Sequence, residues 1–215
     1  KSARVKEQMY SNLSLLRLLY VGRLVKAKNI DVIIRALAQL NQHDFNAQVS
    51  LTIAGEGPEK ANLLQLVSKL QLEQQVVFRG GLEFEQVLDC YANSDVLVLI
   101  SETEGWPKAI TEAMAFGLVC IGSDRGLVPQ ILAEGRGIVI PAGDEDVLVA
   151  QLRQLIRAPE QYAAMRKNAA TWSQDYSLEG LCVALSNLMS AHWDVSLALN
   201  ESKRKYADQH NGIAR

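Results

Sequence analysis

The chain has few cysteines, and none is spaced as a metal site would require. Cys90, Cys120 and Cys182 are its three cysteines, and neither a CxxC pair nor a histidine–cysteine cluster with metal spacing occurs among its 215 residues. This usage is typical of a protein from a reducing compartment that holds no zinc. We therefore expect a cytoplasmic protein without a bound metal.

Long apolar runs and a strong net charge are also missing. The apolar run Val96–Ile100 is far shorter than the roughly 20 residues of a membrane-spanning helix, so we expect none. Lys and Arg number 22 against 24 Asp and Glu, a net charge of −2 with neutral histidines. Because the chain is nearly neutral, it lacks the positive charge of a general polyanion binder, and we expect no nucleic-acid partner. A composition of 48% hydrophobic and 21% charged residues excludes disorder.

The chain begins at Lys1, without a methionine and without a basic segment followed by an apolar one. We therefore expect no secretory signal. The length is compatible with one large domain or with one domain and an appendage. The absence of an initial methionine suggests that the sequence is a fragment of a longer protein.

Short apolar runs alternate with longer segments of helical period. Asn29 is the expected N-cap of the first helix. Strands are predicted over residues 15–21, 48–54, 76–78, 96–100, 118–122 and 138–140. Helices are predicted over residues 30–40, 59–70, 85–91 and 106–116, near Pro129, and from Asp144 to about residue 195 with breaks near Pro159 and Asp175.

The six predicted strands are continuous apolar runs, and helices separate them. This pattern predicts an α/β fold with a parallel sheet covered by helices on both faces. In such sheets ligands bind outside the carboxyl ends of the strands. Functional residues are therefore expected just after Val21, Ala54, Phe78, Ile100 and Gly122.

A long apolar stripe at helical spacing begins after residue 177. We therefore divide the chain into a domain, residues 1–177, and a C-terminal helix with a polar tail, residues 178–215. The stripe packs on the domain's own core or docks on a further domain, in which case the isolated chain would self-associate. Its members are Leu178, Leu181, Cys182, Leu185, Leu188, Met189, His192 and Trp193.

The loop behind the first strand, residues 22–29, carries two candidate phosphate ligands. Arg23 offers a planar fork and Lys28 a point charge, and the two could converge on one phosphate. The alternative is a solvated basic loop. The loop alone does not separate these two interpretations.

The loop behind the fourth strand leads into a helix whose start suits an anion. Gly105 allows a tight turn, and Pro107 fits the first position of a helix because its missing N–H would have no partner there. Backbone N–H groups would then point off this end with the positive end of the helix dipole behind them. These groups belong to Lys108, Ala109 and Ile110.

Two acidic residues flank the same helix end. Glu104 precedes it, and Glu112 lies on the helix at the margin of its apolar face. The alternative for Glu112 is an ordinary i,i+4 ion pair with Lys108. The alternative for Glu104 is a surface acid.

In this order along the chain, the residues resemble the C-terminal, nucleotide-sugar-binding domain of GT-B-fold retaining glycosyltransferases, glycosyltransferase family 4. Two acids separated by seven residues are by themselves only a mildly specific sign of this family. The match becomes strong because they follow the upstream Arg and Lys in the family's order. The resemblance implies a Rossmann-like six-stranded parallel sheet, the C-terminal half of a GT-B fold. It rests on residues 22–24 with 28, 53–59, 77–80, 94–96, 101 with 104–107, 112–117, 137–141 and 143–144.

The resemblance also implies a role for each site residue. Arg23 and Lys28 match the pair that neutralises the donor diphosphate, and Glu104 matches the acid near the transferred sugar. These three form the implied catalytic set. Glu112 matches the acid that binds the ribose hydroxyls, and the backbone around Arg79 would meet the base. The other implied substrate contacts are Gly22, Gly105, Trp106, Pro107, Lys108 and Ala109.

Four positions depart from the family pattern. Trp106 stands where Phe is commoner, Leu118 replaces a usual Pro, and Gln130 stands where Glu is usual. Arg125-Gly126 occupies a place where the family often has two glycines.

Enzymes of this family carry an acceptor domain of comparable size before the donor domain. Only 14 residues precede the first predicted strand, so we expect that domain to be missing from this chain. The resemblance implies a hexosyltransferase that moves a sugar, with retained configuration, from a UDP- or GDP-sugar to an unknown acceptor. No metal cofactor is implied, and any peripheral membrane contact would be made by the missing domain. The alternatives are a non-catalytic nucleotide-binding or adaptor module and a sugar-nucleotide epimerase of the same architecture.

Overall fold

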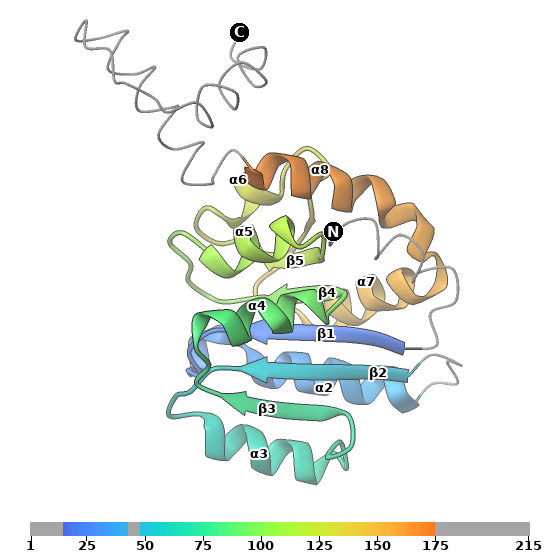
Figure 1. Cartoon of the computed structure of the whole chain (residues 1–215). Coiled ribbons are helices and arrows are strands. Elements are labelled where there is room, and N and C mark those ends of the chain that lie inside the picture. Colours follow the sequence, from blue (N-terminus) through green and yellow to red (C-terminus); the bar gives the residue numbers. More distant parts are fainter. Residues whose placement is uncertain (1–14, 43–47, 175–215) are drawn as a thin grey trace, which may run out of the picture. The chain divides into compact units, whose positions relative to one another are not determined.

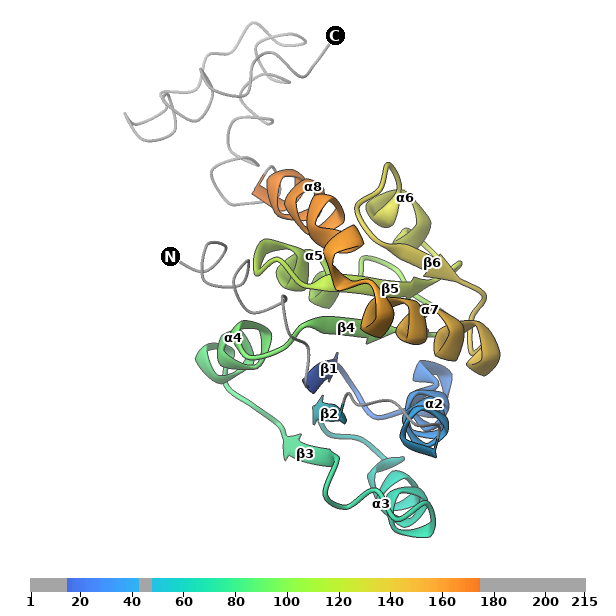
Figure 2. The ribbon, with the colours of Figure 1, turned by 90° about the vertical axis from the view of Figure 1, so that its right-hand side faces the viewer.

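A sheet of six parallel strands forms the centre of the fold, in the order β3-β2-β1-β4-β5-β6 (Figures 1 and 2). The computed structural model describes residues 15–42 and 48–174. The chain divides into two units, Lys1–Ala170 and Thr171–Arg215, and the fold below is that of the first. Its strands are β1 (Leu15–Val21), β2 (Gln48–Ala54), β3 (Val76–Gly80), β4 (Val96–Leu99), β5 (Val119–Ser123) and β6 (Ile138–Ile140).

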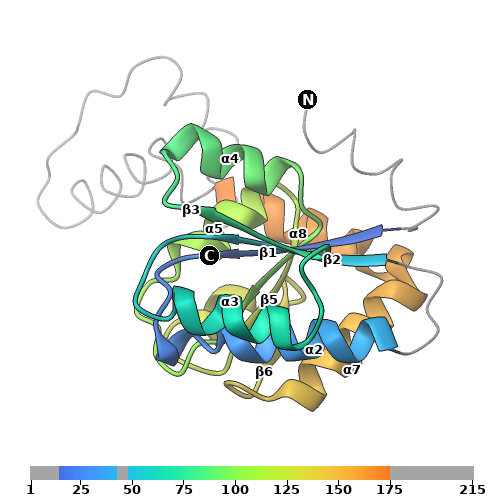
Figure 3. The same cartoon turned by 90° about the horizontal axis from the view of Figure 1, so that it is seen from below.

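Helices connect the strands and cover both faces of the sheet, as the sequence predicts. One face carries α2 (Ile30–Gln42), α3 (Lys60–Lys69) and α7 (Glu145–Arg157), and the other carries α4 (Phe84–Ala92) and α5 (Lys108–Ala115) (Figure 3). The remaining elements are the short α6 (Val128–Leu132), α8 (Ala163–Gln174), and the 3-10 turns η2 (Lys26–Lys28) and η3 (Pro159–Tyr162).

Burial on both faces explains the continuous apolar strands. Every residue of β4 and of β5 is buried, so neither strand alternates between apolar and polar positions. Gly122 in β5 lets two helices approach closely, since an added Cβ would lie 2.4 Å from Val128 and 3.3 Å from Ile110. Both α5 and α6 therefore pack on the same face of β5, which fixes where α5 begins.

The neighbours β1 and β4 form the point at which the strand order reverses. They share only two residue pairs, Leu18 with Val96 and Leu19 with Leu97, whereas β1 and β2 share seven. The carboxyl ends of β1 and β4 thus lie beyond their paired region. In open α/β sheets ligands bind in the crevice at this switch point.

An arginine and an aspartate tie the same two strands at the opposite edge. Arg17 donates to Asp95 through Nη2 at 2.8 Å, Nε at 2.9 Å and its backbone N–H at 3.0 Å. The Asp95 side chain is 3% exposed and that of Arg17 25%. Such a bidentate, largely desolvated pair stiffens the join between two strands that share few ladder bonds.

The predicted element bounds that fall on described residues agree with the structure within two residues. The largest differences are that α2 and β3 continue to Gln42 and Gly80 and that α5 begins at Lys108. Within the described residues, no helix combines the length and the apolar character needed to cross a bilayer. The apolar stripe of residues 178–193 lies outside them, so the domain boundary at residue 177 stays a prediction.

Candidate functional site

The two loops singled out in the sequence meet at the carboxyl edge of β1 and β4. Lys28, at the end of η2, forms an ion pair with Glu104 through Nζ and Oε1 at 2.5 Å. Their side chains are 22% and 9% exposed, so the contact is largely withdrawn from solvent. The structure therefore brings together one predicted phosphate ligand and the acid predicted near the sugar.

Two buried serines hold the Glu104 carboxylate in place. The Ser101 hydroxyl donates to Glu104 Oε1 at 2.7 Å, and the Ser123 hydroxyl donates to the Ser101 carbonyl at 2.7 Å. Both serines are fully buried. Sequence reasoning gave them no role, although a serine directly after a buried strand was a usable signal.

The loop after β5 covers the backbone of Glu104. Gly126 has a φ of +56°, and an added Cβ would lie 1.7 Å from the Glu104 carbonyl oxygen. Only glycine combines that conformation with so close an approach. Its neighbour Arg125 is exposed and lies 3.4 Å from an Asp124 carboxylate oxygen.

The loop after β1 is fixed from beneath by a buried tyrosine. The Tyr20 hydroxyl donates to the Arg23 carbonyl at 2.9 Å. Burial, and to a lesser degree the charge of Glu104, raises the pKa of Tyr20, so the hydroxyl stays a donor. The Gly22 N–H donates to the Ala54 carbonyl at 3.0 Å. The Arg23 side chain is exposed and forms no ion pair with any described residue. Of the two predicted phosphate ligands, therefore, only Lys28 contacts Glu104.

The start of α5 differs from the prediction. Pro107 is the N-cap rather than the first helical residue. The Lys108 N–H donates to the Trp106 carbonyl and the Ile110 N–H to the Pro107 carbonyl, both at 2.9 Å. The expectation of free N–H groups on Lys108 and Ile110 is therefore wrong, because the preceding turn supplies their acceptors. Ala109 has no backbone acceptor within the described chain.

Gly105 is also used differently from the expectation. Its φ is not positive, so the turn does not depend on the conformational freedom of glycine. The predicted reason for a glycine there is wrong. Apart from its two chain neighbours, no heavy atom of the described residues lies within 4 Å of where its Cβ would be, so this side of the loop is open toward the described part of the chain.

Glu112 lies on α5 with both carboxylate oxygens engaged. The Tyr91 hydroxyl, from α4, donates to Oε2 at 2.9 Å, and Lys108 Nζ lies 3.1 Å from Oε1. The i,i+4 ion pair given as the alternative for Glu112 is thus present. Lys108 is 73% exposed against 21% for Glu112 and also lies over the Phe84 ring, with Nζ 5.6 Å from its centre. Burial, followed by the charge of Glu112, raises the pKa of Tyr91 and keeps it a donor.

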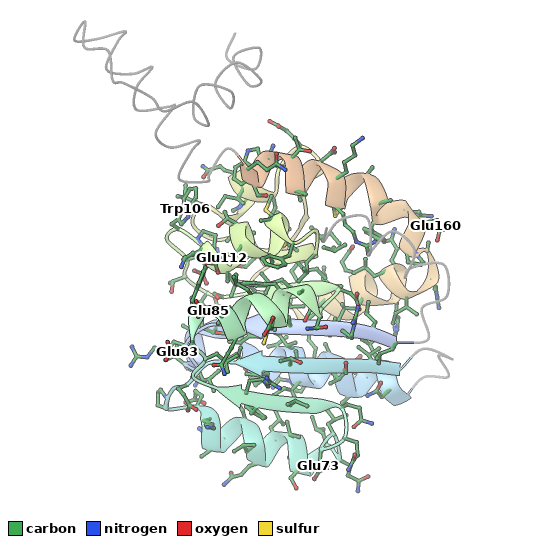
Figure 4. All side chains as sticks on the ribbon, in the orientation of Figure 1. Glu73, Glu83, Glu85, Trp106, Glu112 and Glu160 are labelled. Carbon is green, nitrogen blue, oxygen red and sulfur yellow. The ribbon has the colours of Figure 1, made fainter. Side chains whose placement is uncertain are left out.

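The remaining predicted contacts lie along the same edge. Trp106 is 50% exposed, and Figure 4 shows it with Glu112 at the edge where the strands end, opposite Glu73. Arg79 belongs to β3 rather than to the loop after it, and it is exposed. No group of three or more His, Cys, Asp or Glu in the described chain is arranged to hold a metal ion.

Asn29 differs from its predicted role as an N-cap. Its backbone is left-handed, with φ 51° and ψ 37°, whereas an N-cap residue is usually extended. Its side-chain amide donates across to the Ile100 carbonyl at 2.9 Å and to Glu102 Oε1 at 2.8 Å. Its carbonyl accepts the N–H groups of Val32 and Ile33 at 3.2 and 3.4 Å, but no N–H of the described residues donates to its side-chain oxygen, so the predicted side-chain cap is not formed.

A 3-2-1-4-5-6 parallel sheet with charged side chains at its β1–β4 switch point defines a Rossmann-like domain. The chain belongs to the family Glycosyl transferases group 1, which residues 5–172 match. The sequence-based identification and fold class are confirmed.

Curated relatives are glycosyltransferases, and the chain spans less than half of their length. N-acetyl-alpha-D-glucosaminyl L-malate synthase of Bacillus anthracis is 31% identical over 153 residues, which cover 71% of this chain and 39% of that protein. Amylovoran biosynthesis glycosyltransferase AmsD of Erwinia amylovora is 32% identical over 167 residues, 76% of this chain and 45% of that protein.

Solved structures share the fold. Sucrose-phosphate synthase from Thermosynechococcus elongatus superposes with a TM-score of 0.73 at 24% identity, over 91% of this chain and 49% of that one. The C-terminal domain of a glycosyl transferase group 1 family protein from Francisella tularensis gives 0.68 at 20% identity, over 76% of this chain and 87% of that one.

Proposed function

We propose that this chain is the donor-binding domain of a retaining hexosyltransferase that takes its sugar from a nucleoside-diphosphate sugar. The observation that carries the proposal is the contact between Lys28 and Glu104, a cation and a carboxylate side by side at the switch point. Two similar proteins support the ligand class. A relative from Mycolicibacterium smegmatis is named a GDP-mannose-dependent mannosyltransferase, and a structurally similar Anabaena protein was crystallised with UDP.

Lys28 and Arg23 hold the donor diphosphate in this proposal. The Lys28 ammonium has three donors and gives one to Glu104, so the others remain for phosphate oxygens. The exposed Arg23 fork adds a bidentate contact. When the bond between the anomeric carbon and the phosphate oxygen breaks, its electron pair leaves with the diphosphate. Both cations stabilise the charge that develops there.

Glu104 acts on the sugar side of the same bond. Positive charge builds on the sugar ring as the diphosphate leaves, and a carboxylate beside the ring stabilises it. The Ser101 hydrogen bond fixes the Glu104 carboxylate in advance, so little reorganisation is needed during reaction. The acceptor hydroxyl oxygen then bonds to the anomeric carbon on the face that the diphosphate leaves, and its proton passes to the oxygen of the departing diphosphate.

Glu112 binds the ribose, and the backbone near Arg79 at the end of β3 meets the base. The oxygen Oε1 is available to a ribose hydroxyl because its partner Lys108 is largely exposed and easily displaced. The backbone of the open loop from Gly105 to Ala109 faces the sugar and phosphates. We propose a cytoplasmic enzyme that needs no metal, whose acceptor site comes from a domain outside this chain.

Alanine substitutions at the two cations test the proposal. Calorimetric titrations with UDP, GDP and ADP should find one nucleotide that binds, with or without EDTA. Lys28→Ala and Arg23→Ala should each weaken it about tenfold or more, since a hydrogen bond to a charged group contributes about 1.5–3 kcal/mol. Lys26→Ala is the matched control, because Lys26 is an exposed lysine in the same turn η2. Unchanged affinity in both variants, or an equal loss in the control, would refute the phosphate assignment.

A further inference from the structure

Asn29 directly follows Lys28 and joins the loop after β1 to the loop after β4. Its side-chain Nδ2 donates to the Ile100 carbonyl at 2.9 Å and to Glu102 Oε1 at 2.8 Å. The Glu102 N–H donates to the Ala27 carbonyl at 2.8 Å and closes the same junction. Three hydrogen bonds therefore connect the two loops within two residues of Lys28.

The surroundings of Asn29 leave its side chain little freedom. Its left-handed backbone, with φ 51°, suits only glycine, asparagine and aspartate well. The loop after β6 packs on the amide, since a Cβ on Gly143 would lie 2.9 Å from Asn29 Nδ2 and 3.3 Å from Glu102 Oε1. The amide thus lies at a partly exposed junction of three loops.

The ion pair between Lys28 and Glu104 does not fix the two loops by itself. The lysine side chain is a flexible stem of four carbons, so an ion pair at its tip leaves the position of its backbone open. Glu104 is already fixed on its own loop by Ser101. The backbone from which the Lys28 ammonium projects is held within its own turn by the Lys28 N–H, which donates to the Val25 carbonyl at 3.0 Å. It is held against the loop after β4 by the Asn29 amide and the Glu102 N–H.

We propose that Asn29 is a positioning residue, whose side-chain amide sets the place at which Lys28 meets the donor diphosphate. The inference rests on the proposed function only in that Lys28 binds the diphosphate. It assigns to the Asn29 amide no contact with the ligand. Removing the amide should therefore weaken the recognition of phosphate and spare the recognition of the nucleoside.

Asn29→Gly is the direct test, because glycine keeps the left-handed backbone and removes only the amide. Gln71→Gly is the matched control, since Gln71 is also left-handed, with φ 58°, and lies between α3 and β3 at the far edge of the sheet. The 215-residue chain is titrated with UDP, GDP, ADP and the three corresponding nucleosides. Asn29→Gly should weaken the diphosphate that binds by about tenfold and leave its nucleoside unchanged, while the control changes neither.

Glu102 provides a second route to the same junction. Glu102→Ala removes one acceptor of the amide, whereas Glu102→Gln keeps an acceptor oxygen. Glu102→Ala should weaken the diphosphate about threefold, and Glu102→Gln should bind it like the wild type. Combined with Asn29→Gly, Glu102→Ala should add almost nothing further, because both act through one hydrogen bond.

The outcomes separate the two proposals. If the wild type binds a diphosphate and Asn29→Gly binds it equally well, the inference falls and the proposed function stands. An equal loss for the nucleoside would show a merely structural role and also overturn the inference. If the wild type binds none of the three diphosphates, both proposals fall. If Asn29→Gly shows no thermal unfolding transition, the variant is not folded and the two Glu102 variants become the test. Equal diphosphate affinity in Glu102→Ala and Glu102→Gln would then overturn the inference.

Discussion

Glu112→Gln removes the charge of the acid proposed to bind the ribose and keeps its size. In the structure the Tyr91 hydroxyl occupies Oε2 at 2.9 Å, so only Oε1 is available to a ribose hydroxyl. That hydroxyl must displace Lys108, which lies 3.1 Å away with a 73% exposed side chain. The variant should therefore weaken nucleotides through one specific contact.

The size of the effect follows from these two contacts. A hydrogen bond to a carboxylate contributes about 1.5–3 kcal/mol, whereas the exposed ion pair that it replaces contributes only about 0.2–1 kcal/mol. The net gain is about 1–2 kcal/mol, which corresponds to roughly 5- to 30-fold in affinity. The wild-type chain should thus prefer the nucleoside diphosphate over its 2′-deoxy or 3′-deoxy analogue by that factor.

Calorimetric titration of both proteins with the ribose and deoxyribose ligands measures this preference. In Glu112→Gln the preference should fall several-fold, because the amide oxygen still accepts from the ribose hydroxyl but a neutral hydrogen bond contributes only about 0.5–1.5 kcal/mol. Glu85→Gln, an exposed acid on the neighbouring α4, should keep the full preference. A Glu112→Gln protein that still favours the ribose ligand as strongly as the wild type would refute the assignment of Glu112.

Two further predictions concern the sugar side and the fold. Glu104→Gln in the full-length enzyme should cut turnover about a hundredfold, roughly 2.7 kcal/mol, at nearly unchanged nucleotide affinity, while Glu73→Gln changes neither. An NMR time course that shows an inverted product, or normal turnover in the variant, would contradict this role. Asp95→Ala leaves Arg17 without its carboxylate and should lower the free energy of unfolding by about 3 kcal/mol in urea titrations. A loss below about 1 kcal/mol would show that the pair does not stabilise the join between β1 and β4.

The sheet could be predicted from the sequence because its central strands are buried on both faces. Val96–Leu99 is apolar at every position, and the turn and cap residues that separate the strands mark where each one ends. Parallel topology then places the loops after β1 and β4 at one edge. That topology explains why Lys28 and Glu104 meet, although the sequence analysis did not predict their contact.

The contacts that fix the site could not be predicted, because they join distant residues. An asparagine before an apolar helix start predicts an N-cap, but Asn29 has a left-handed backbone and its Nδ2 donates to the Ile100 carbonyl, 71 residues away. Tyr91 reaches Glu112 because α4 and α5 pack on the same face of the sheet, and helical spacing does not encode that alignment. The N–H groups of α5 were misjudged because the geometry of the preceding turn was unknown.

Gly126 shows that solvent exposure is a poor guide to which positions of this chain tolerate mutation. The residue is exposed, yet any side chain there would press on the Glu104 carbonyl oxygen. Natural variants or library members altered at Gly126 would then lose the placement of Glu104 with no change in any group that meets a ligand. A mutagenesis screen that leaves only the buried and charged positions unchanged would mutate Gly126. The resulting proteins would lose activity although every buried and every charged residue is intact.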